Sequence, residues 1–254
     1  METSSLRLLA FDTSTEVMSI AVCRPHQGET RLWQHTAPGA AQASATLLPA
    51  ILDLMQQAGL GFAELDAIAF GRGPGAFTGL RTACSVAQGL GFGAQGLPGG
   101  RSLPLLPVDT LLCMAEVARD TLGAGAGFRV LSLLDARMGE VYHAAYEFDG
   151  TAWQLHGSQQ LQSPQRVQLP TGWDAECVVL ADNVFDLPGA QWAFDPVAQR
   201  LPVLPQAAAL LRLAPALLAA GQAVAPEMAW PTYIRDKVAQ TTQERAAAKA
   251  SAVV

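Results

Sequence analysis

Basic residues are few in this chain of 254 residues, and charged residues of both signs make up only 15% of it. The 16 lysines and arginines are outnumbered by 22 aspartates and glutamates, which leaves a net charge of −6 at pH 7. Affinity for nucleic acid rests mainly on cations that neutralise phosphates. The sequence therefore predicts no strong direct binding to nucleic acid.

Long apolar runs are also missing. The two longest, at 102–118 and 207–220, are interrupted by charge or proline and fall short of the roughly 18 to 20 apolar residues that a membrane helix needs. The first residues lack a basic segment followed by an apolar run, so we expect no signal peptide. The expectation is a cytoplasmic protein with no membrane contact.

Motifs for metal, redox and hydrolytic chemistry are absent as well. The four cysteines contain no Cys-x-x-Cys pair, and the four histidines contain no His-x-x-x-His spacing. Such spacings are typical of redox and zinc sites, so the sequence predicts free thiols and no metal site. No Gly-x-Ser-x-Gly elbow supports a serine hydrolase.

Apolar residues, by contrast, make up half of the chain, which is enough for a sizeable core. Short runs of β-favouring residues alternate with segments of helical spacing, and the first two runs form a hairpin. This order predicts an α/β protein with mixed sheets. We expect an N-terminal lobe at 1–109, a C-terminal lobe at 110–235 and a flexible tail at 236–254.

A polar turn between the first two strands is the first candidate nucleotide site. Asp12, Thr13 and Ser14 lie in it, and a carboxylate and hydroxyls at such a turn can face a phosphate and its magnesium. The alternative is an ordinary hairpin turn, which these residue types also favour.

The glycine-rich segment GRGPGAFTGLR, at 71–81, is the second candidate. Gly73 and Gly75 lie in it, just before a helix that can begin near Thr78. No Gly-Lys-Ser/Thr follows, so it is not a Walker loop. A phosphate cradle and a tight structural turn both remain open, because glycines permit a close approach to either.

Two helical segments carry more apolar surface than one core needs. The segment 41–58 has leucines on more than one face, and 79–93 is rich in small residues that permit close helix approach. The surplus can pack on another chain or on the second lobe, and both interpretations stay open. The candidate partner contacts are Leu47, Leu48, Ile51, Leu54, Met55, Leu80, Ala83, Ala87 and Leu90.

Five segments resemble, in their order, the TsaB (YeaZ) family of tRNA threonylcarbamoyladenosine biosynthesis: LLAFDTSTEVMSIAV, GRGPGAFTGLRTACSVAQGLGFG, LPVDTLLCMAE, SLLDARMGEVYHAAYE and PTYIRD. They cover most of 6–148 and a short stretch near Tyr233. The resemblance implies the two-lobed fold of actin-like ATPases (the ASKHA or ribonuclease H-like architecture). It also implies a non-catalytic subunit that pairs through its two N-terminal helices with a catalytic TsaD-like subunit. That subunit modifies adenosine 37 of tRNA, and a TsaE-like ATPase joins the pair.

Two positions support a scaffold role within this resemblance. TsaD-like chains carry two metal-binding histidines four residues apart where this chain has Thr110 and Met114. Neither a hydroxyl nor a thioether suits a catalytic zinc or iron site as imidazole does. We expect no tightly bound cofactor and no strong direct binding of tRNA. We leave open ATP or ADP at or near the partner interface, and a homodimer when the chain is alone.

A rival function is an actin-fold ATPase or small-molecule kinase that acts alone, with Asp12 holding magnesium and the glycine loop holding phosphates. Its weakness is the lack of a convincing general base. A metalloprotease, the historical glycoprotease or peptidase M22 label of the superfamily, is a further rival, but the sequence lacks the metal ligands for it.

The connection at 93–107 is longer than is usual in the family, and so is the tail.

Overall fold

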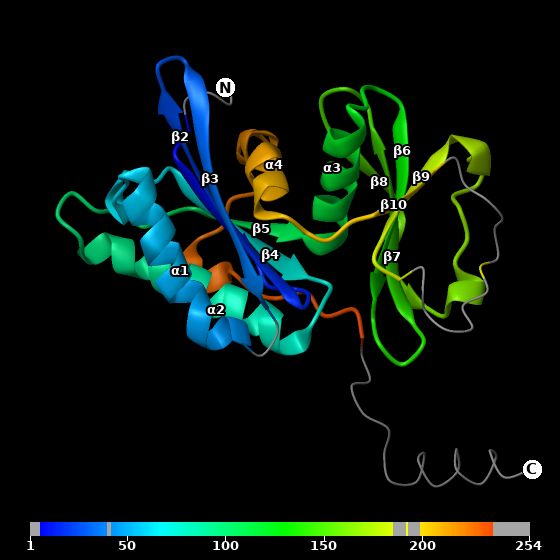
Figure 1. Ribbon diagram of the computed structural model, residues 1–254, viewed down its shortest axis with the longest axis horizontal. Coiled ribbons are helices and arrows are strands. Elements are labelled where there is room, and N and C mark those ends of the chain that lie inside the picture. The colour runs from blue at the N-terminus through cyan, green and yellow to red at the C-terminus, as the bar shows by residue number, and fades with distance from the viewer. Residues whose placement is uncertain (1–5, 40–41, 185–191, 193–198, 236–254) are drawn as a thin grey trace, which may run out of the picture.

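The computed structural model describes residues 6–39, 42–184, 192 and 199–235. The chain forms two lobes, each built on a five-stranded sheet, with helices α3 (Thr110–Leu122) and α4 (Ala207–Ala219) between them (Figure 1). The predicted α/β class with mixed sheets is confirmed. No helix within the described ranges is long and apolar enough to span a bilayer.

The first sheet has the strand order β3-β2-β1-β4-β5. Its first two neighbour pairs, from β3 to β1, are antiparallel, and the pairs from β1 to β5 are parallel. Every side chain of the central strand β1 is buried, as expected where both faces of a sheet are covered. The strands are β1 (Leu8–Asp12), β2 (Val17–His26), β3 (Glu29–Pro38), β4 (Ala67–Gly73) and β5 (Leu105–Asp109).

The second sheet repeats this plan. Its order is β8-β7-β6-β9-β10, with antiparallel pairs from β8 to β6 and parallel pairs from β6 to β10. The hairpin that opens each half therefore occupies the same place in both sheets. The strands are β6 (Phe128–Asp135), β7 (Val141–Phe148), β8 (Trp153–Gln162), β9 (Val178–Asp182) and β10 (Gln199–Pro202).

Helices α1 (Ala43–Ala58) and α2 (Phe77–Gly93) cover the outer face of the first sheet (Figure 1). The buried side chains of α1 recur at helical spacing and fill one core with Phe11, Ile20 and Phe70 from the strands. α1 ends at Gly59, which adopts the left-handed conformation with φ 62° that favours glycine.

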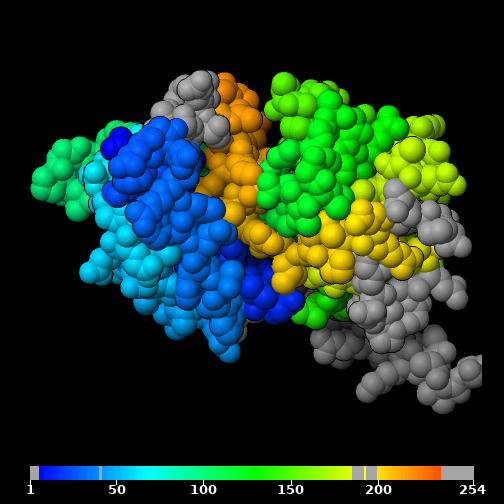
Figure 2. All heavy atoms as spheres, turned by 45° about the horizontal axis from the view of Figure 1, so that its top comes forward, coloured from blue at the N-terminus to red at the C-terminus, as the bar shows by residue number. Residues whose placement is uncertain are grey.

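The inner layer joins the two lobes. α4 lies on the first sheet against β1 and β2, and α3 lies on the second sheet against β6. The two helices also pack on each other, and Figure 2 shows α4, in orange, wedged between the first lobe and the green α3. One cluster of buried side chains runs through strands of both sheets and both helices.

The expected C-terminal lobe at 110–235 stays a prediction, although α4 within that range packs on the first sheet. α4 is apolar around most of its circumference, so it is stable only where protein covers it on both sides. After α4 the chain returns to the first lobe, where Val224 pairs with Leu105 and the Thr232 amide donates to the Arg72 carbonyl. The expected tail at 236–254 lies outside the described residues.

Glu116 of α3 is the buried charge of the inner layer. Its carboxylate accepts hydrogen bonds from Arg119 at 2.8 and 2.9 Å, from Arg212 of α4 at 2.9 Å and from the Trp153 indole of β8 at 3.1 Å. Burial raises the pKa of Glu116, but the hydrogen bonds from Arg119, Trp153 and Arg212 and the Arg119 charge outweigh it and lower the pKa. The carboxylate therefore ties α3, α4 and β8 together in its ionised form.

We expect Glu116→Gln to destabilise the fold by about 2 kcal/mol at pH 7, since it leaves two arginines without their shared partner. A carboxyl whose pKa is lowered by folding contributes fully above its unfolded pKa of about 4.3, and the contribution disappears as pH falls through the folded pKa. The difference in urea-unfolding free energy from the unsubstituted chain should therefore shrink below about pH 4. Glu29→Gln on exposed β3 is the matched control and should change stability by less than about 0.5 kcal/mol. Equal effects of the two variants would contradict the role of Glu116.

Candidate functional site

The two loops proposed to bind phosphate pack against each other. The Thr13 hydroxyl donates to the Gly79 carbonyl at 2.7 Å, and the Ala76 amide donates to the Ser14 carbonyl at 2.7 Å. A Cβ at Gly75 would lie 2.6 Å from the Ser14 Cβ, and one at Gly79 would overlap the Thr13 carbonyl oxygen. The glycines therefore serve close packing of loop on loop, which favours the structural-turn alternative for this segment.

Asp12 is fully buried beneath this contact. Its Oδ1 accepts hydrogen bonds from the Ser14 amide at 2.8 Å and the Ser14 hydroxyl at 2.6 Å, while Gly71 lies directly against Oδ2. Burial raises the pKa of Asp12, and the hydrogen bonds from Ser14 partly oppose this. The expectation that Asp12 offers a carboxylate to magnesium stays a prediction: protein encloses the group, and its Oδ2 has no hydrogen-bond partner among the described residues.

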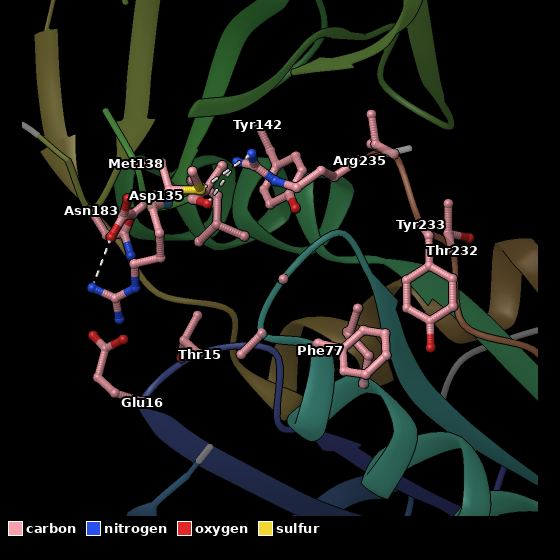
Figure 3. Close-up of a pocket in the computed structure, with 17 residues that line it drawn as sticks. Thr15, Glu16, Phe77, Asp135, Met138, Tyr142, Asn183, Thr232, Tyr233 and Arg235 are labelled. Atoms are coloured by element: carbon pink, nitrogen blue, oxygen red, sulfur yellow. Dashed lines mark hydrogen bonds and ion pairs between the residues drawn. The ribbon is translucent and has the colours of Figure 1, made fainter. Parts of the chain in front are cut away.

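A cleft of about 610 Å³ opens beside these loops, between the two lobes (Figure 3). Its walls come from Thr15 and Glu16, from the start of α2 at 75–80, from the β6–β7 turn at 135–138, and from 232–235. Of the five residues expected to bind nucleotide, only Gly75 lines it. Thr13 and Ser14 are buried, and Gly73 is covered by the Thr232 carbonyl and Leu80.

The segment 232–235 crosses the cleft and contacts both lobes. Tyr233 stacks on Phe77 of α2 with ring centroids 5.3 Å apart, and its hydroxyl accepts a hydrogen bond from Arg81 at 3.1 Å. Arg235 reaches the other wall, where it pairs with Glu140 at 2.7 Å and donates to the Ala136 carbonyl at 3.0 Å. Among the described residues this segment is thus a direct link between α2 and the second sheet.

Sequence reasoning did not assign these residues to a site. The only signal was the motif PTYIRD, which stood out as a family segment but has no spacing that predicts a cleft wall. Phe77 and Asn183 also line the cleft without having been singled out.

The electrostatics of the cleft do not favour a phosphate. Arg137 pairs with Asp135 at 3.0 Å, and Arg235 pairs with Glu140, so both lining arginines are already neutralised. Glu16 adds an exposed carboxylate to the wall. The remaining lining is largely apolar or aromatic, including Leu80, Leu134 and Tyr142. The cleft can therefore hold an apolar or aromatic group more readily than a free phosphate.

Most of the proposed partner contacts are buried in the chain's own core, which corrects that expectation. Seven of the nine are at most 3% exposed. Six of these belong to the core between the helices and the first sheet, and the seventh, Leu80, lines the cleft. The side chains concerned are Leu47, Ile51, Leu54, Met55, Leu80, Ala83 and Ala87. Leu90 is half-buried against the same core, and Leu48 alone of the nine is exposed.

The exposed apolar surface of this helix pair lies elsewhere on the same helices. Leu48 and Leu52 are one turn apart on α1 and are 43% and 50% exposed, and Phe77 and Phe92 are exposed near the two ends of α2. We call these four side chains the α1–α2 face. Sequence reasoning detected the surplus of apolar residues on both faces of α1, but of the candidates it chose there only Leu48 is exposed.

Thr110 and Met114, which the family resemblance places at the positions of histidines in TsaD-like chains, are both fully buried in α3. Within the described ranges no three His, Cys, Asp or Glu side chains come together as a metal-binding group. The absence of a metal from the protein stays a prediction.

Two lobes built on one repeated sheet plan, with a cleft between them, define this chain as a protein of the actin-like ATPase fold class. Comparison with known proteins narrows the class. A family model described as TsaD, tRNA N6-adenosine threonylcarbamoyltransferase, matches residues 38–252. The tRNA threonylcarbamoyladenosine biosynthesis protein TsaB of Escherichia coli K12 is 34% identical, over 92% of this chain and 96% of its own length. TsaB of Haemophilus influenzae is also 34% identical, over 67% of this chain and 74% of its own.

Solved structures point to the same family as the sequence relatives. YeaZ from Pseudomonas aeruginosa superposes with a TM-score of 0.77 at 38% identity, over 90% of this chain and 99% of that one. A second structure from that organism, described as an uncharacterized protein with similarity to peptidase YeaZ, also gives 0.77 and 38%. The chain belongs to the TsaB (YeaZ) family.

The loop contact makes a prediction about two glycines of the same helix. Gly79→Ala should destabilise the fold by about 2 kcal/mol, because its Cβ collides with backbone of the β1–β2 turn. Gly89→Ala meets no atom within 4 Å and should be neutral or stabilise by up to about 1 kcal/mol through helix propensity. Urea unfolding at one fixed protein concentration compares them. A Gly79→Ala variant as stable as Gly89→Ala would show that the two loops are not closely packed.

Proposed function

We propose that the chain is a non-catalytic partner subunit in tRNA threonylcarbamoyladenosine biosynthesis, which pairs with a TsaD-like catalytic subunit through the α1–α2 face. Membership in the TsaB family supports the pathway. The observation that carries the pairing surface is the exposure of Leu48 and Leu52 on a helix whose other apolar stripe already fills the core. A helix that only covers its own lobe needs one such stripe.

The chemistry of the α1–α2 face fits a protein partner. Exposed leucine and phenylalanine side chains on two neighbouring helices are unfavourable in water and, where they gather, are typical of a protein interface. Large apolar and aromatic side chains also tend to dominate the binding energy of interfaces. When the TsaD-like subunit is absent, a second copy of this chain can cover the same face in a symmetric homodimer.

The non-catalytic role rests on the loops and on α3. The carboxylate that the rival ATPase or kinase function needs for magnesium is enclosed at Asp12, and the lining arginines of the cleft are paired. Thr110 and Met114 stand where TsaD-like chains have metal-binding histidines. The peptidase wording in the description of one P. aeruginosa structure is not supported by any of these groups.

The remaining parts of the proposal concern the assembly. A TsaE-like ATPase joins the pair, and ATP or ADP binds at or near the partner interface and not tightly to this chain alone. The tRNA is bound mainly by the partner, since this chain carries a net charge of −6. The assembly works in the cytoplasm.

Leu48→Asp tests the pairing surface. We expect it to weaken binding to the TsaD-like protein of the same organism at least about 30-fold, because a buried carboxylate would replace an apolar contact. Leu155→Asp on β8 is the matched control, since both leucines are 43% exposed and Leu155 lies on the other lobe. Light scattering and calorimetry of the mixed proteins measure the effect. Full binding by Leu48→Asp, or equal loss in the control, would contradict the proposed face.

Magnesium-ATP tests the non-catalytic role. Titration into the isolated chain should give no tight saturable heat and no phosphate release, because the cleft offers no unpaired arginine and Asp12 is enclosed. The same titration with the TsaD-like subunit present measures whether binding depends on the pair. Tight binding with turnover by this chain alone would favour the kinase or ATPase function.

A further inference from the structure

The outer face of the second sheet is covered differently from that of the first. On the first sheet α1 packs over β2 and β3. On the second sheet Val167, Val184 and other apolar residues of the segments beyond β8 cover β6 and β9. Over β7 and β8, the counterparts of β2 and β3, lies a pocket of about 490 Å³, which we call the β7–β8 pocket.

The β7–β8 pocket has a polar wall over an apolar floor. Leu131 and Ala145 form part of the floor. Of the described residues that line the pocket, none carries a carboxylate. The polar side chains that line it are His143, His156, Ser158, Gln160, Gln162, Arg166, Gln168 and Thr171.

His143 is the most deeply buried histidine of this set, and within the described ranges it has no acidic neighbour of the kind that His156 has in Glu147. It is only 6% exposed, and its Nε2 has no hydrogen-bond partner among the described residues, although Gln162 hydrogen-bonds the ring. Buried polar atoms in folded proteins nearly always have a partner, so an unpaired imidazole nitrogen beside a pocket indicates a missing polar group. A ligand or an ordered water that reaches the floor of the pocket can supply that group.

Arg166 gives the pocket its charge. It is exposed at the rim, and no ion pair with it is found within the described ranges. His156 differs from Arg166 in having an acidic neighbour, since its Nε2 lies 3.2 Å from Oε2 of Glu147 on β7. An unpaired guanidinium with amide and hydroxyl donors nearby is suited to an oxyanion, and it stands out in a chain whose net charge is −6.

We propose that the β7–β8 pocket binds a small oxyanion, the phosphate or carboxylate group of a metabolite, through the Arg166 guanidinium and the donors of Gln160, Gln168 and Thr171. The site lies on the second sheet, away from the α1–α2 face, and it does not depend on the proposed pairing function.

The site has a consequence for pH. Burial lowers the pKa of His143, and the hydrogen bond with Gln162 partly opposes this, so the ring is neutral at pH 7. The groups around the pocket are His156 and the glutamines from β8, Arg166 from the following segment, and Glu147 on the strand of His143. An added anion favours the imidazolium form. Binding should therefore take up a proton and become tighter as pH falls from 8 to 6.

Titration of inorganic phosphate and, separately, acetate into the full chain tests the proposal. Imidazole NMR signals report binding near His143 and His156, and the two probes distinguish a phosphate from a carboxylate site. We expect saturable shifts with at least one anion and about tenfold weaker binding in Arg166→Gln. Arg31→Gln, an exposed arginine of β3, makes the same change of net charge and should bind as the unsubstituted chain does.

Three results would overturn the oxyanion site. These are no saturable shift with either anion at millimolar concentration, equal weakening in Arg166→Gln and Arg31→Gln, and full affinity in Arg166→Gln. The second result would mean that only net charge matters. Because Arg166 is exposed, its variant should unfold at the same temperature as the parent when no anion is present, which separates loss of binding from loss of fold.

Discussion

The contact between the β1–β2 turn and the glycine-rich loop is the constraint on which much of this structure depends. The turn buries Asp12 and Thr13, and the loop can lie on it only because Gly75 and Gly79 have no side chains. This contact sets where α2 begins. It therefore also sets the cleft wall at Phe77 and the direction in which the rest of α2 presents its outer face. A loop that resembles a phosphate cradle in sequence here packs closely against the backbone of the β1–β2 turn.

The repeated sheet plan explains the fold, and its unequal coverage explains the two surfaces. The first sheet carries helices outside, and those helices keep an apolar stripe that their own lobe does not use. Among the described residues, the second sheet is covered outside by segments after β8 that lie over β6 and β9 and contain no α-helix, and polar side chains of β7 and β8 surround a pocket. One plan used twice thus gives an apolar face on one lobe and a polar pocket on the other.

The sequence predicted what local pattern decides. The β1–β2 hairpin with its polar turn, the end of α1 before Gly59 and the α/β class follow from periodicity, turn residues and a glycine C-cap. The sequence did not predict the features that depend on tertiary packing, such as which side of a helix is buried. Leu48 is exposed and Ile51 is buried because the sheet lies on one side of α1. The sequence of the helix alone does not say which of its apolar stripes faces the sheet. The sequence of β8 does not predict a strand, because this edge strand with exposed glutamines lacks a regular alternating apolar pattern.

The positions of α4 and of the segment 232–235 also depend on contacts between residues that are far apart in the sequence. Residues more than 100 positions apart, such as Arg81 and Tyr233, meet because the chain returns to the first lobe after α4. Tyr233 holds the start of α2, and Arg235, two residues on, holds the β6–β7 turn through Glu140. A displacement of α2 at its outer face is therefore opposed by contacts in the second lobe. The cleft and the α1–α2 face both include residues of α2, and the segment 232–235 links α2 to the second lobe. A shift of α2 would therefore change both surfaces.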